Sequence, residues 1–279
     1  MTKTYTPAQP IWCAGCGDFG VQGALERALI DLNIAKHDVM ILAGIGCSGT
    51  LQNNVGTYGY HALHGRVLPT ATGVAFANPD LTVVAVGGDG DGFAIGAGHF
   101  LHAVKRNPNL VYIVMNNSVY GLTKGQDSPT MDSPSAADGL DATRLALSIP
   151  GASFIARGFS RWSHQLHELT VAAFEHARAK RGFAFLEVLS PCVTYNDTYA
   201  SWESMLDNVD EDPDYDPTDI TAAFKRGVDL DAVGRMPAGL IYKNEVSVGR
   251  EVPPSMANQD LDPRQHLEGY GKIMASYAV

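Results

Sequence analysis

Four short runs of apolar residues mark the strands that we expect in this chain. They are rich in β-branched residues and almost continuously apolar rather than alternating, which is typical of strands buried on both faces of a parallel sheet. The runs are Val39 to Ala43, Leu81 to Val86, Leu110 to Met115 and Phe183 to Leu189. The pattern therefore predicts a parallel sheet at the centre of the protein.

Segments with helical character lie between these runs, so the chain reads as repeated strand–helix–strand units. They are Phe19 to Leu32, Ile95 to Arg106 and His164 to Arg181. A crossover helix packs on one face of the sheet that its strands form. We therefore expect an α/β fold with a doubly wound, mostly parallel sheet and helices on both faces.

The chain changes character after residue 206. From Asp207 to Asp219 it is rich in Asp and Pro and contains no Lys or Arg, which is typical of a solvated segment. We expect residues 1–206 to form the main domain. Residues 207–279 are expected to form an acidic connector and a weakly structured C-terminal tail, which packs on the same domain or on a partner subunit.

Composition narrows the class of protein. The 279 residues are 45% hydrophobic, include 29 glycines and carry a formal net charge of -10, which argues against a nucleic-acid partner because clustered Lys and Arg are missing. No apolar run reaches the roughly 18 to 20 residues of a membrane span, and the polar start lacks the features of a signal peptide. We expect a cytoplasmic protein without membrane contact.

Polar or glycine-rich clusters follow the end of each predicted strand. They are Gly44 to Gly49, Gly87 to Gly92, Asn116 to Gly121, and Ser190 to Cys192. In open parallel sheets the carboxyl ends of the strands form the edge where ligands bind. The sequence therefore predicts a ligand site that these four segments share.

The glycine-rich segment after the second strand has Asp89 in its middle. Glycines let backbone N–H groups approach a phosphate closely, and the following helix N-terminus favours negative charge. A carboxylate there would repel phosphate, so it indicates a bridging divalent cation such as Mg2+, which prefers oxygen ligands. The spacing of the glycines does not match the fingerprint of a dinucleotide-binding site. The alternative to a phosphate site is a tight turn with a purely structural role.

Asn116 and Asn117 end the next strand and offer amide oxygens to the same cation. Gly88-Asp89-Gly90, followed across one helix and one strand by these asparagines, resembles the thiamine-diphosphate motif. The resemblance implies that Asp89 and Asn117 bind Mg2+ through side-chain oxygens and that Val119 contributes its carbonyl.

The chain has four cysteines, Cys13, Cys16, Cys47 and Cys192. A disulfide framework is not expected in a chain of this length without an export signal. The first two form a Cys-x-x-Cys turn, which alone could be a zinc knuckle, a redox dithiol or a surface turn, and the other two follow strand ends. Four thiolates could bind zinc or a 4Fe-4S cluster, and the neighbouring glycines favour the cluster.

The motifs together resemble the β subunit of 2-oxoacid:ferredoxin oxidoreductases over about residues 10 to 200. The segments that carry the resemblance are Trp12 to Gly20, Gly46 to Gly49, His64 to Arg66, Gly88 to Gly90 with Asn117, Gly121 to Gln126, and Ser128 to Thr130. The resemblance implies thiamine diphosphate, Mg2+ and one 4Fe-4S cluster held by all four cysteines. It also implies oxidative decarboxylation of a 2-oxoacid with coenzyme A, with single electrons passing through the cluster to ferredoxin.

The 2-oxoglutarate branch is the most similar, with pyruvate or broad-range 2-oxoacid enzymes as the alternative. The resemblance further implies an α subunit that presents a carboxylate to the aminopyrimidine of the cofactor, in an αβ or (αβ)2 assembly. Two rival interpretations remain: a non-redox thiamine-diphosphate decarboxylase or carboligase, and a zinc-stapled α/β binding protein.

Candidate residues follow from these motifs. For the substrate they are His64, Arg66 and Lys124, with His61 as a weaker candidate, because a 2-oxoacid carboxylate needs a cation or a neutral donor. For the cofactor they are Gly46, Cys47, Ser48, His64, Gly88, Asp89, Gly90, Asp91, Asn117, Val119, Gly121, Leu122 and Thr123.

Overall fold

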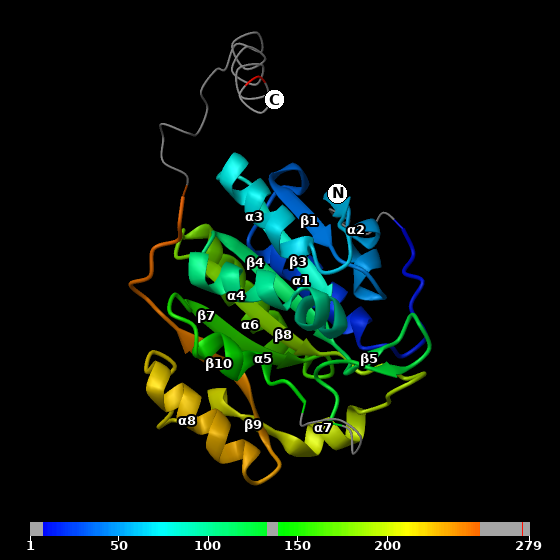
Figure 1. The fold of residues 1–279 in the computed structure, drawn as a ribbon, viewed down its shortest axis with the longest axis vertical. Helices are drawn as coiled ribbons and strands as arrows, with labels where there is room; N and C mark the ends of the chain where they lie inside the picture. Colours follow the sequence, from blue (N-terminus) through cyan, green and yellow to red (C-terminus); the bar gives the residue numbers. More distant parts are fainter. Residues whose placement is uncertain (1–7, 133–138, 252–274, 276–279) are drawn as a thin grey trace.

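A computed structural model describes residues 8–132, 139–251 and 275, and its centre is a sheet of eight strands in the order β2-β1-β3-β4-β8-β7-β10-β9. Figure 1 shows the central strands lying side by side. The bounds are β1 Val39–Ala43, β2 Tyr58–His61, β3 Thr82–Gly88, β4 Leu110–Asn116, β7 Phe154–Phe159, β8 Phe183–Leu189, β9 Leu206–Asn208 and β10 Met236–Lys243. A separate antiparallel pair, β5 Val119–Tyr120 and β6 Gln126–Asp127, lies outside this sheet.

The four strands expected from apolar runs are β1, β3, β4 and β8, and they are neighbours with parallel pairing throughout. Their side chains alternate between two hydrophobic clusters. In β4, for example, Val111 and Ile113 belong to one cluster, whereas Tyr112 and Val114 belong to the other. Both faces of each strand are therefore buried, which explains why the runs are continuously apolar.

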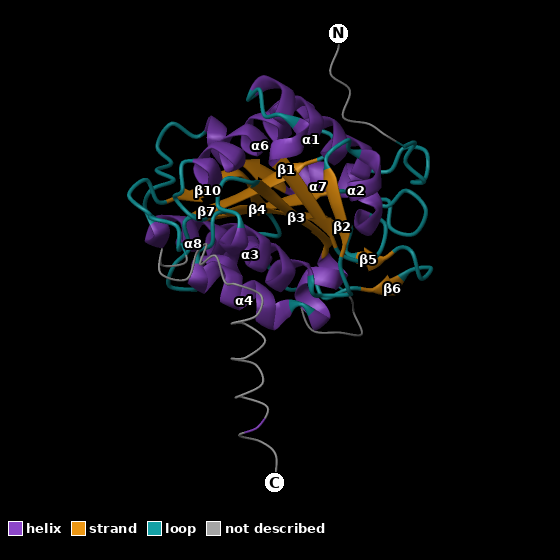
Figure 2. Ribbon diagram, turned by 90° about the horizontal axis from the view of Figure 1, so that it is seen from above, coloured by secondary structure: helices purple, strands orange, loops and turns teal. Residues whose placement is uncertain are grey.

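Helices cover both faces of the sheet, as Figure 2 shows with α1 and α6 on one side and α3, α4 and α8 on the other. The bounds of the helices are α1 Asp18–Asp31, α2 Leu51–Asn54, α3 Val67–Ala77, α4 Ala97–Arg106, α5 Ala142–Leu147, α6 Ser163–Arg178, α7 Tyr199–Met205 and α8 Ile220–Asp231. The expected doubly wound α/β fold is confirmed. No helix in the described part of the chain is long and apolar enough to cross a membrane.

The expectation of a weakly structured tail is wrong for residues 220–243. Asp219 caps α8 by accepting bonds from the N–H groups of Thr221 and Ala222, and β10 pairs antiparallel with β7 (Figure 1). The acidic stretch before α8 is also not simply solvated, because Asp207 forms ion pairs with Arg226 and Arg235. The division of the chain at residue 207 stays a prediction, and residues 252–274 and 276–279 lie outside the described part.

Candidate active site

A cavity of about 290 Å³ lies where the loops after β1, β3 and β4 meet at the carboxyl edge of the sheet. Because these strands are parallel neighbours, their carboxyl ends bring together segments that are far apart in sequence. All the residues that we expected to bind the cofactor line this cavity. The lining is Asp18, Ile45, Gly46, Cys47, Ser48, His64, Gly88, Asp89, Gly90, Asp91, Met115, Asn117, Val119, Tyr120, Gly121, Leu122 and Thr123.

Asp89 is the most deeply buried acid of the cavity, with 1% of its surface exposed. Its Oδ2 accepts hydrogen bonds from the hydroxyls of Ser128 and Thr130, the latter at 2.7 Å, and its Oδ1 accepts a long bond of 3.5 Å from the Asn117 N–H. Burial raises the pKa of Asp89, although these hydrogen bonds oppose the shift. Within the described residues no Arg, Lys or His forms an ion pair with it, so its charge is left for an external cation.

Asp91 holds three chain segments together beside Asp89. Its Oδ1 accepts bonds from the N–H of Ile45 at 3.1 Å, from the N–H of Gly65 at 2.8 Å and from His64 Nδ1 at 2.7 Å. The carboxylate also lies against Gly44, where any Cβ would collide with it. Asp91 therefore fixes the loops after β1 and β2 and orients the His64 ring.

The glycine turn after β3 packs against Tyr120, a residue for which the sequence predicted no role. A Cβ at Gly90 would collide with the ring of Tyr120, whose hydroxyl donates to the Gly90 carbonyl at 3.4 Å. Burial raises the pKa of Tyr120, and the charges of Asp89 and Asp91 add to the rise. Tyr120 therefore closes one wall of the cavity in its neutral form.

Asn117 and Val119 reach the cavity through a turn whose middle residue, Ser118, has a left-handed φ of 56°. The turn is fixed by a bond from the Val119 N–H to Asn117 Oδ1 at 3.0 Å and by a bond from Asn196 Nδ2 to the Asn117 carbonyl at 2.9 Å. Carboxylate, amide and carbonyl oxygens are the ligands that Mg2+ prefers. The residues present therefore fit a magnesium diphosphate.

At the same edge Cys47 and Cys192 both lie near Gly121, and Cys13 and Cys16 are near enough to interact electrostatically with Cys47. Cys13 is exposed, Cys16 and Cys47 are half-buried and Cys192 is buried. A Cβ at Gly121 would lie 3.6 Å from the sulfur of Cys192 and 3.9 Å from that of Cys47.

Electrostatics couple these thiols to one another. Burial raises the pKa of Cys47 to about 11, with further contributions from Asp18 and from the thiols of Cys192 and Cys13. However, the described residues include no group of three or more His, Cys, Asp or Glu side chains arranged as metal ligands. The four-cysteine cluster therefore stays a prediction.

The residues expected to bind substrate are more dispersed than the cofactor residues. His64 lines the cavity, whereas Arg66 does not. The Arg66 guanidinium instead donates to the carbonyls of Gly65 and Ile95, both at 3.2 Å. His61 lies on β2, where its Nδ1 is 3.1 Å from Gln52 Nε2. Lys124 is exposed and follows directly after the lining residue Thr123.

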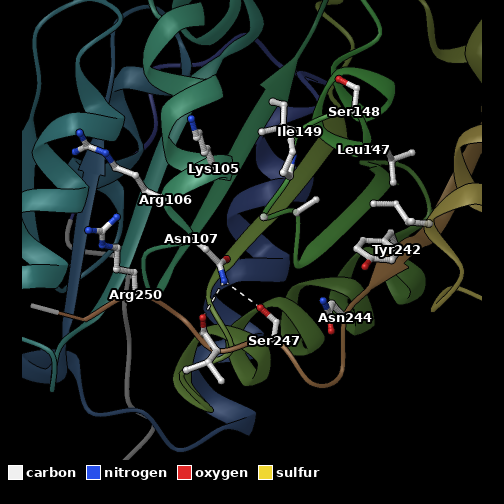
Figure 3. Close-up of a pocket in the computed structure, with 15 residues that line it drawn as sticks. Lys105, Arg106, Asn107, Leu147, Ser148, Ile149, Tyr242, Asn244, Ser247 and Arg250 are labelled. Carbon is white, nitrogen blue, oxygen red and sulfur yellow. Dashed lines mark hydrogen bonds between the residues drawn. The ribbon is translucent and has the colours of Figure 1, made fainter.

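A larger cavity of about 650 Å³ lies at the opposite edge of the sheet, among residues such as Lys105, Arg106 and Arg250 (Figure 3). Asn107, one of its polar residues, binds the chain itself, because its Nδ2 donates to Ser247 Oγ at 3.0 Å and to the Val248 carbonyl at 3.3 Å. None of the candidate residues lines it. The cavity at the carboxyl edge is therefore the candidate active site.

Comparison with known families first defines the class. Residues 44–188 match the model of the thiamine pyrophosphate enzyme C-terminal TPP-binding domain, and residues 192–254 match that of the C-terminal part of the pyruvate ferredoxin oxidoreductase β subunit. The first match spans the sheet edge with its cavity. The fold and site therefore define a thiamine-diphosphate enzyme.

Relatives narrow the class to a family. The chain is 38% identical to the 2-oxoacid:ferredoxin oxidoreductase subunit β of Sulfolobus sp., covering 96% of this chain and 94% of the relative. It is also 38% identical to the 2-oxoglutarate oxidoreductase subunit KorB of Mycobacterium tuberculosis, over 70% of this chain and 54% of the relative.

A solved structure extends the comparison to three dimensions. It is the 2-oxoglutarate:ferredoxin oxidoreductase from Magnetococcus marinus with 2-oxoglutarate, coenzyme A and succinyl-CoA bound. It matches with a TM-score of 0.80 and 32% identity over 100% of this chain and 97% of the other. The chain belongs to the β subunits of the 2-oxoacid:ferredoxin oxidoreductases.

Proposed function

We propose that this β subunit takes part in the oxidative decarboxylation of a 2-oxoacid with coenzyme A to acyl-CoA and CO2, and that single electrons pass through a 4Fe-4S cluster to ferredoxin. The observation that carries the proposal is Asp89, a buried carboxylate with no cation partner among the described residues, in a cavity lined by all the expected cofactor residues. Mg2+ would supply the missing positive charge, and the diphosphate would bind in the cavity beside it.

In this proposal Asp89, Asn117 and Val119 hold Mg2+ through oxygen atoms. Bound thiamine diphosphate supplies the electron sink that decarboxylation of a 2-oxoacid requires. His64 lines the cavity with its Nδ1 held by Asp91, which leaves Nε2 as the ring atom for contact with cofactor or substrate. Tyr120 and Leu122 also line the cavity.

The substrate that we favour is 2-oxoglutarate, with pyruvate or broad 2-oxoacid use as the alternative. The preference is supported by the 2-oxoglutarate enzymes among the relatives and by the ligands named for the Magnetococcus marinus enzyme. Lys124 is the candidate for the second carboxylate, because it is exposed beside the cavity, whereas the Arg66 guanidinium already serves two backbone carbonyls.

Cys13, Cys16, Cys47 and Cys192 are proposed to hold the cluster. Their approach to one corner of the cavity supports this, since electrons would then travel a short way from the cofactor. Replacement of Cys192 by Ser should bleach the visible iron-sulfur absorption and stop ferredoxin reduction. A full cluster and full activity in that variant would contradict the assignment.

An α subunit is proposed to supply the carboxylate that meets the aminopyrimidine, in an αβ or (αβ)2 assembly. The β in the relatives' names supports this, and so does the fact that the described residues form one large α/β sheet, the eight-stranded one. The isolated chain should show no 2-oxoacid-dependent dye reduction, and addition of the α subunit should restore it. Full turnover by the chain free of other polypeptides would contradict the requirement for a partner.

The decisive experiment measures three properties of the purified complex of this chain with its α subunit: iron content, Mg2+-dependent binding of thiamine diphosphate, and coenzyme A-dependent viologen reduction with a panel of 2-oxoacids. We expect iron, binding that requires Mg2+, and the fastest reduction with 2-oxoglutarate. Thiamine diphosphate without iron would indicate a non-redox decarboxylase or carboligase. Zinc without iron or thiamine would indicate a binding protein.

A further inference from the structure

We propose that Asp18 and Ser190 form a buried clasp that holds two cysteine segments of the proposed iron-sulfur site against each other. The Ser190 hydroxyl donates to Asp18 Oδ1 at 2.6 Å. Asp18 lies two residues after Cys16, and Ser190 lies two residues before Cys192. The inference rests on the proposed function, in which the four cysteines hold a 4Fe-4S cluster. No role was expected for either side chain of the clasp.

The two ends of the clasp belong to rigid parts of the fold. Asp18 is the first residue of α1, whose Val21 and Leu25 are buried in the hydrophobic core. Ser190 directly follows β8, and its N–H donates at 2.7 Å to the carbonyl of Asn116 at the end of β4. The bond between the two side chains therefore fixes the start of α1 relative to the carboxyl edge of the sheet.

A backbone contact beside the clasp shows how closely the two segments approach. The Gly17 N–H donates to the Pro191 carbonyl at 3.1 Å. A Cβ at Gly17 would lie 2.7 Å from the Cα and the carbonyl carbon of Ser190, so this approach requires a glycine. Because Gly17 follows Cys16 and Pro191 precedes Cys192, this second bond joins the same two cysteine segments.

The carboxylate of the clasp depends on the serine because it is buried. Asp18 is 2% exposed and Ser190 is fully buried. Burial raises the pKa of Asp18 to about 6, and hydrogen bonds from the side chains of Ser190 and Cys16 oppose the rise. A buried carboxylate needs hydrogen-bond donors, and Cys16 cannot donate once it binds iron as a thiolate. Of these two donors, only Ser190 then remains.

The segment that carries Cys47 is joined by a different bond. Trp12, which directly precedes Cys13, donates from its Nε1 to the Cys47 carbonyl at 2.9 Å. The Trp12 ring also packs edge-on against Phe19 of α1, with 5.3 Å between the ring centroids. Bonds of the chain itself therefore connect all three segments that carry cysteines. The clasp supports the cysteines in the way that outer partners orient metal ligands.

The test measures iron loss from the full complex with the α subunit. Ser190→Ala and Asp18→Leu remove the bond, whereas Asp18→Asn keeps an oxygen that can accept from the serine. Under anaerobic conditions, an iron chelator should bleach the visible iron-sulfur absorption roughly 10- to 100-fold faster in the first two variants, the range by which partners of metal ligands change metal affinity. Asp18→Asn should lose iron at close to the rate of the unmodified complex.

A matched control removes a hydrogen bond that does not join two segments. The Thr50 hydroxyl donates at 2.8 Å to the carbonyl of Cys47, which is three residues away in the same segment. Thr50→Val should therefore lose iron at nearly the unmodified rate. Mg2+-dependent binding of thiamine diphosphate should persist in Ser190→Ala, because the clasp acts on the cysteines and not on the Mg2+ ligands.

The outcomes separate the clasp from the proposed function. If Ser190→Ala and Asp18→Leu retain iron as long as Thr50→Val does, the clasp is refuted and the cluster assignment stands. Loss of iron from Asp18→Asn as fast as from Asp18→Leu would also refute it, since the charge rather than the bond would then matter. So would an equal loss of thiamine diphosphate binding in Ser190→Ala, which would show a general loosening of the edge. An unmodified complex without iron would instead contradict the proposed function itself.

Discussion

Two groups of buried or half-buried carboxylates occur in neighbouring parts of the molecule, and their charges are compensated in different ways. Glu187 and Asp141 share the guanidinium of Arg157, with distances of 2.7 and 2.8 Å. Asp89 and Asp91, at the end of β3, receive bonds from hydroxyls, backbone N–H groups and His64, but from no Arg or Lys of the described chain. Glu187, Asp89 and Asp91 are buried, and Asp141 is half-buried.

The difference appears in the pKa values of Asp141 and Asp89. Burial tends to raise the pKa of Asp141, yet Arg157 and local hydrogen bonds bring it well below its usual range. Burial raises the pKa of Asp89, which has no such partner. A buried charge must be compensated. A buried carboxylate that is paired with a cation of the chain has a structural role. A buried carboxylate without such a partner is suited to bind a cation from outside.

The strongest test of this contrast is Asp89→Asn, which keeps the shape but removes the charge. Mg2+-dependent binding of thiamine diphosphate should fall by more than roughly 100-fold, because changes to groups that merely orient ligands already cost about 10- to 100-fold. Isothermal titration measures the loss. The matched variant Asp141→Asn should keep the Mg2+ affinity and lower the melting temperature, and the reverse result in the two variants would contradict the contrast.

A second test addresses the structural group. Arg157→Met leaves the buried Glu187 without a cation and Asp141 with Arg144 alone, and removal of one partner of a buried pair costs roughly 3 to 5 kcal/mol. Chemical denaturation should show this decrease in the free energy of unfolding. An unchanged unfolding midpoint would show that water, rather than Arg157, compensates these acids.

A third test asks which cationic side chain binds the second carboxylate of the substrate. Lys124→Met should raise the KM for 2-oxoglutarate by roughly 10- to 150-fold, the equivalent of a charge-assisted hydrogen bond of about 1.5 to 3 kcal/mol, and leave the KM for pyruvate nearly unchanged. Arg66→Met is the control, since its guanidinium binds the carbonyls of Gly65 and Ile95. Equal changes for both substrates in Lys124→Met would indicate a contact with the shared 2-oxo carboxylate.

The smallest effect is expected away from both groups, at His176, which is 2% exposed and 3.1 Å from Ser153 Oγ. Burial first, and then Arg181 and Lys243, lower its pKa to about 4. Between its ordinary value of about 6.5 and 4, the unfolded chain binds a proton that the folded chain does not, so stability is lost as the pH falls through this window. His176→Gln should remove about 1 to 2 kcal/mol of that loss, as measured by denaturation at pH 7 and 4.5. A pH dependence identical to that of the unmodified protein would exclude His176 as its source.

The central strands could be predicted because each is apolar on both faces, as β4 shows. Strand β7 was missed because Arg157 and Gly158 interrupt its apolar run. Arg157 can be buried because it forms ion pairs with Glu187 and Asp141, and the sequence does not show that these residues lie beside it. Strand β10 was missed because Pro237 and Gly239 are unusual in a strand.

The cofactor residues could be predicted because local motifs place them at strand ends. The hydrogen bonds that hold these residues in place could not be predicted, because their donors are distant in sequence. Ser128 and Thr130, which donate to Asp89, follow it by 39 and 41 residues. Arg66 was expected to meet substrate from its position in the motif alone, and the contacts of its guanidinium are set by where Ile95 lies in the fold.

The position of β10 also has a consequence for how the protein is made. β10 covers the edge of β7 with antiparallel bonds, although residues 154–159 leave the ribosome about 80 residues before residues 236–243 do. Until β10 arrives, β7 presents unpaired backbone groups of the kind that recruit other strands. We therefore expect the nascent chain to complete the strands of its cofactor edge first and to expose an unpaired, aggregation-prone edge of β7 until β10 has been synthesised.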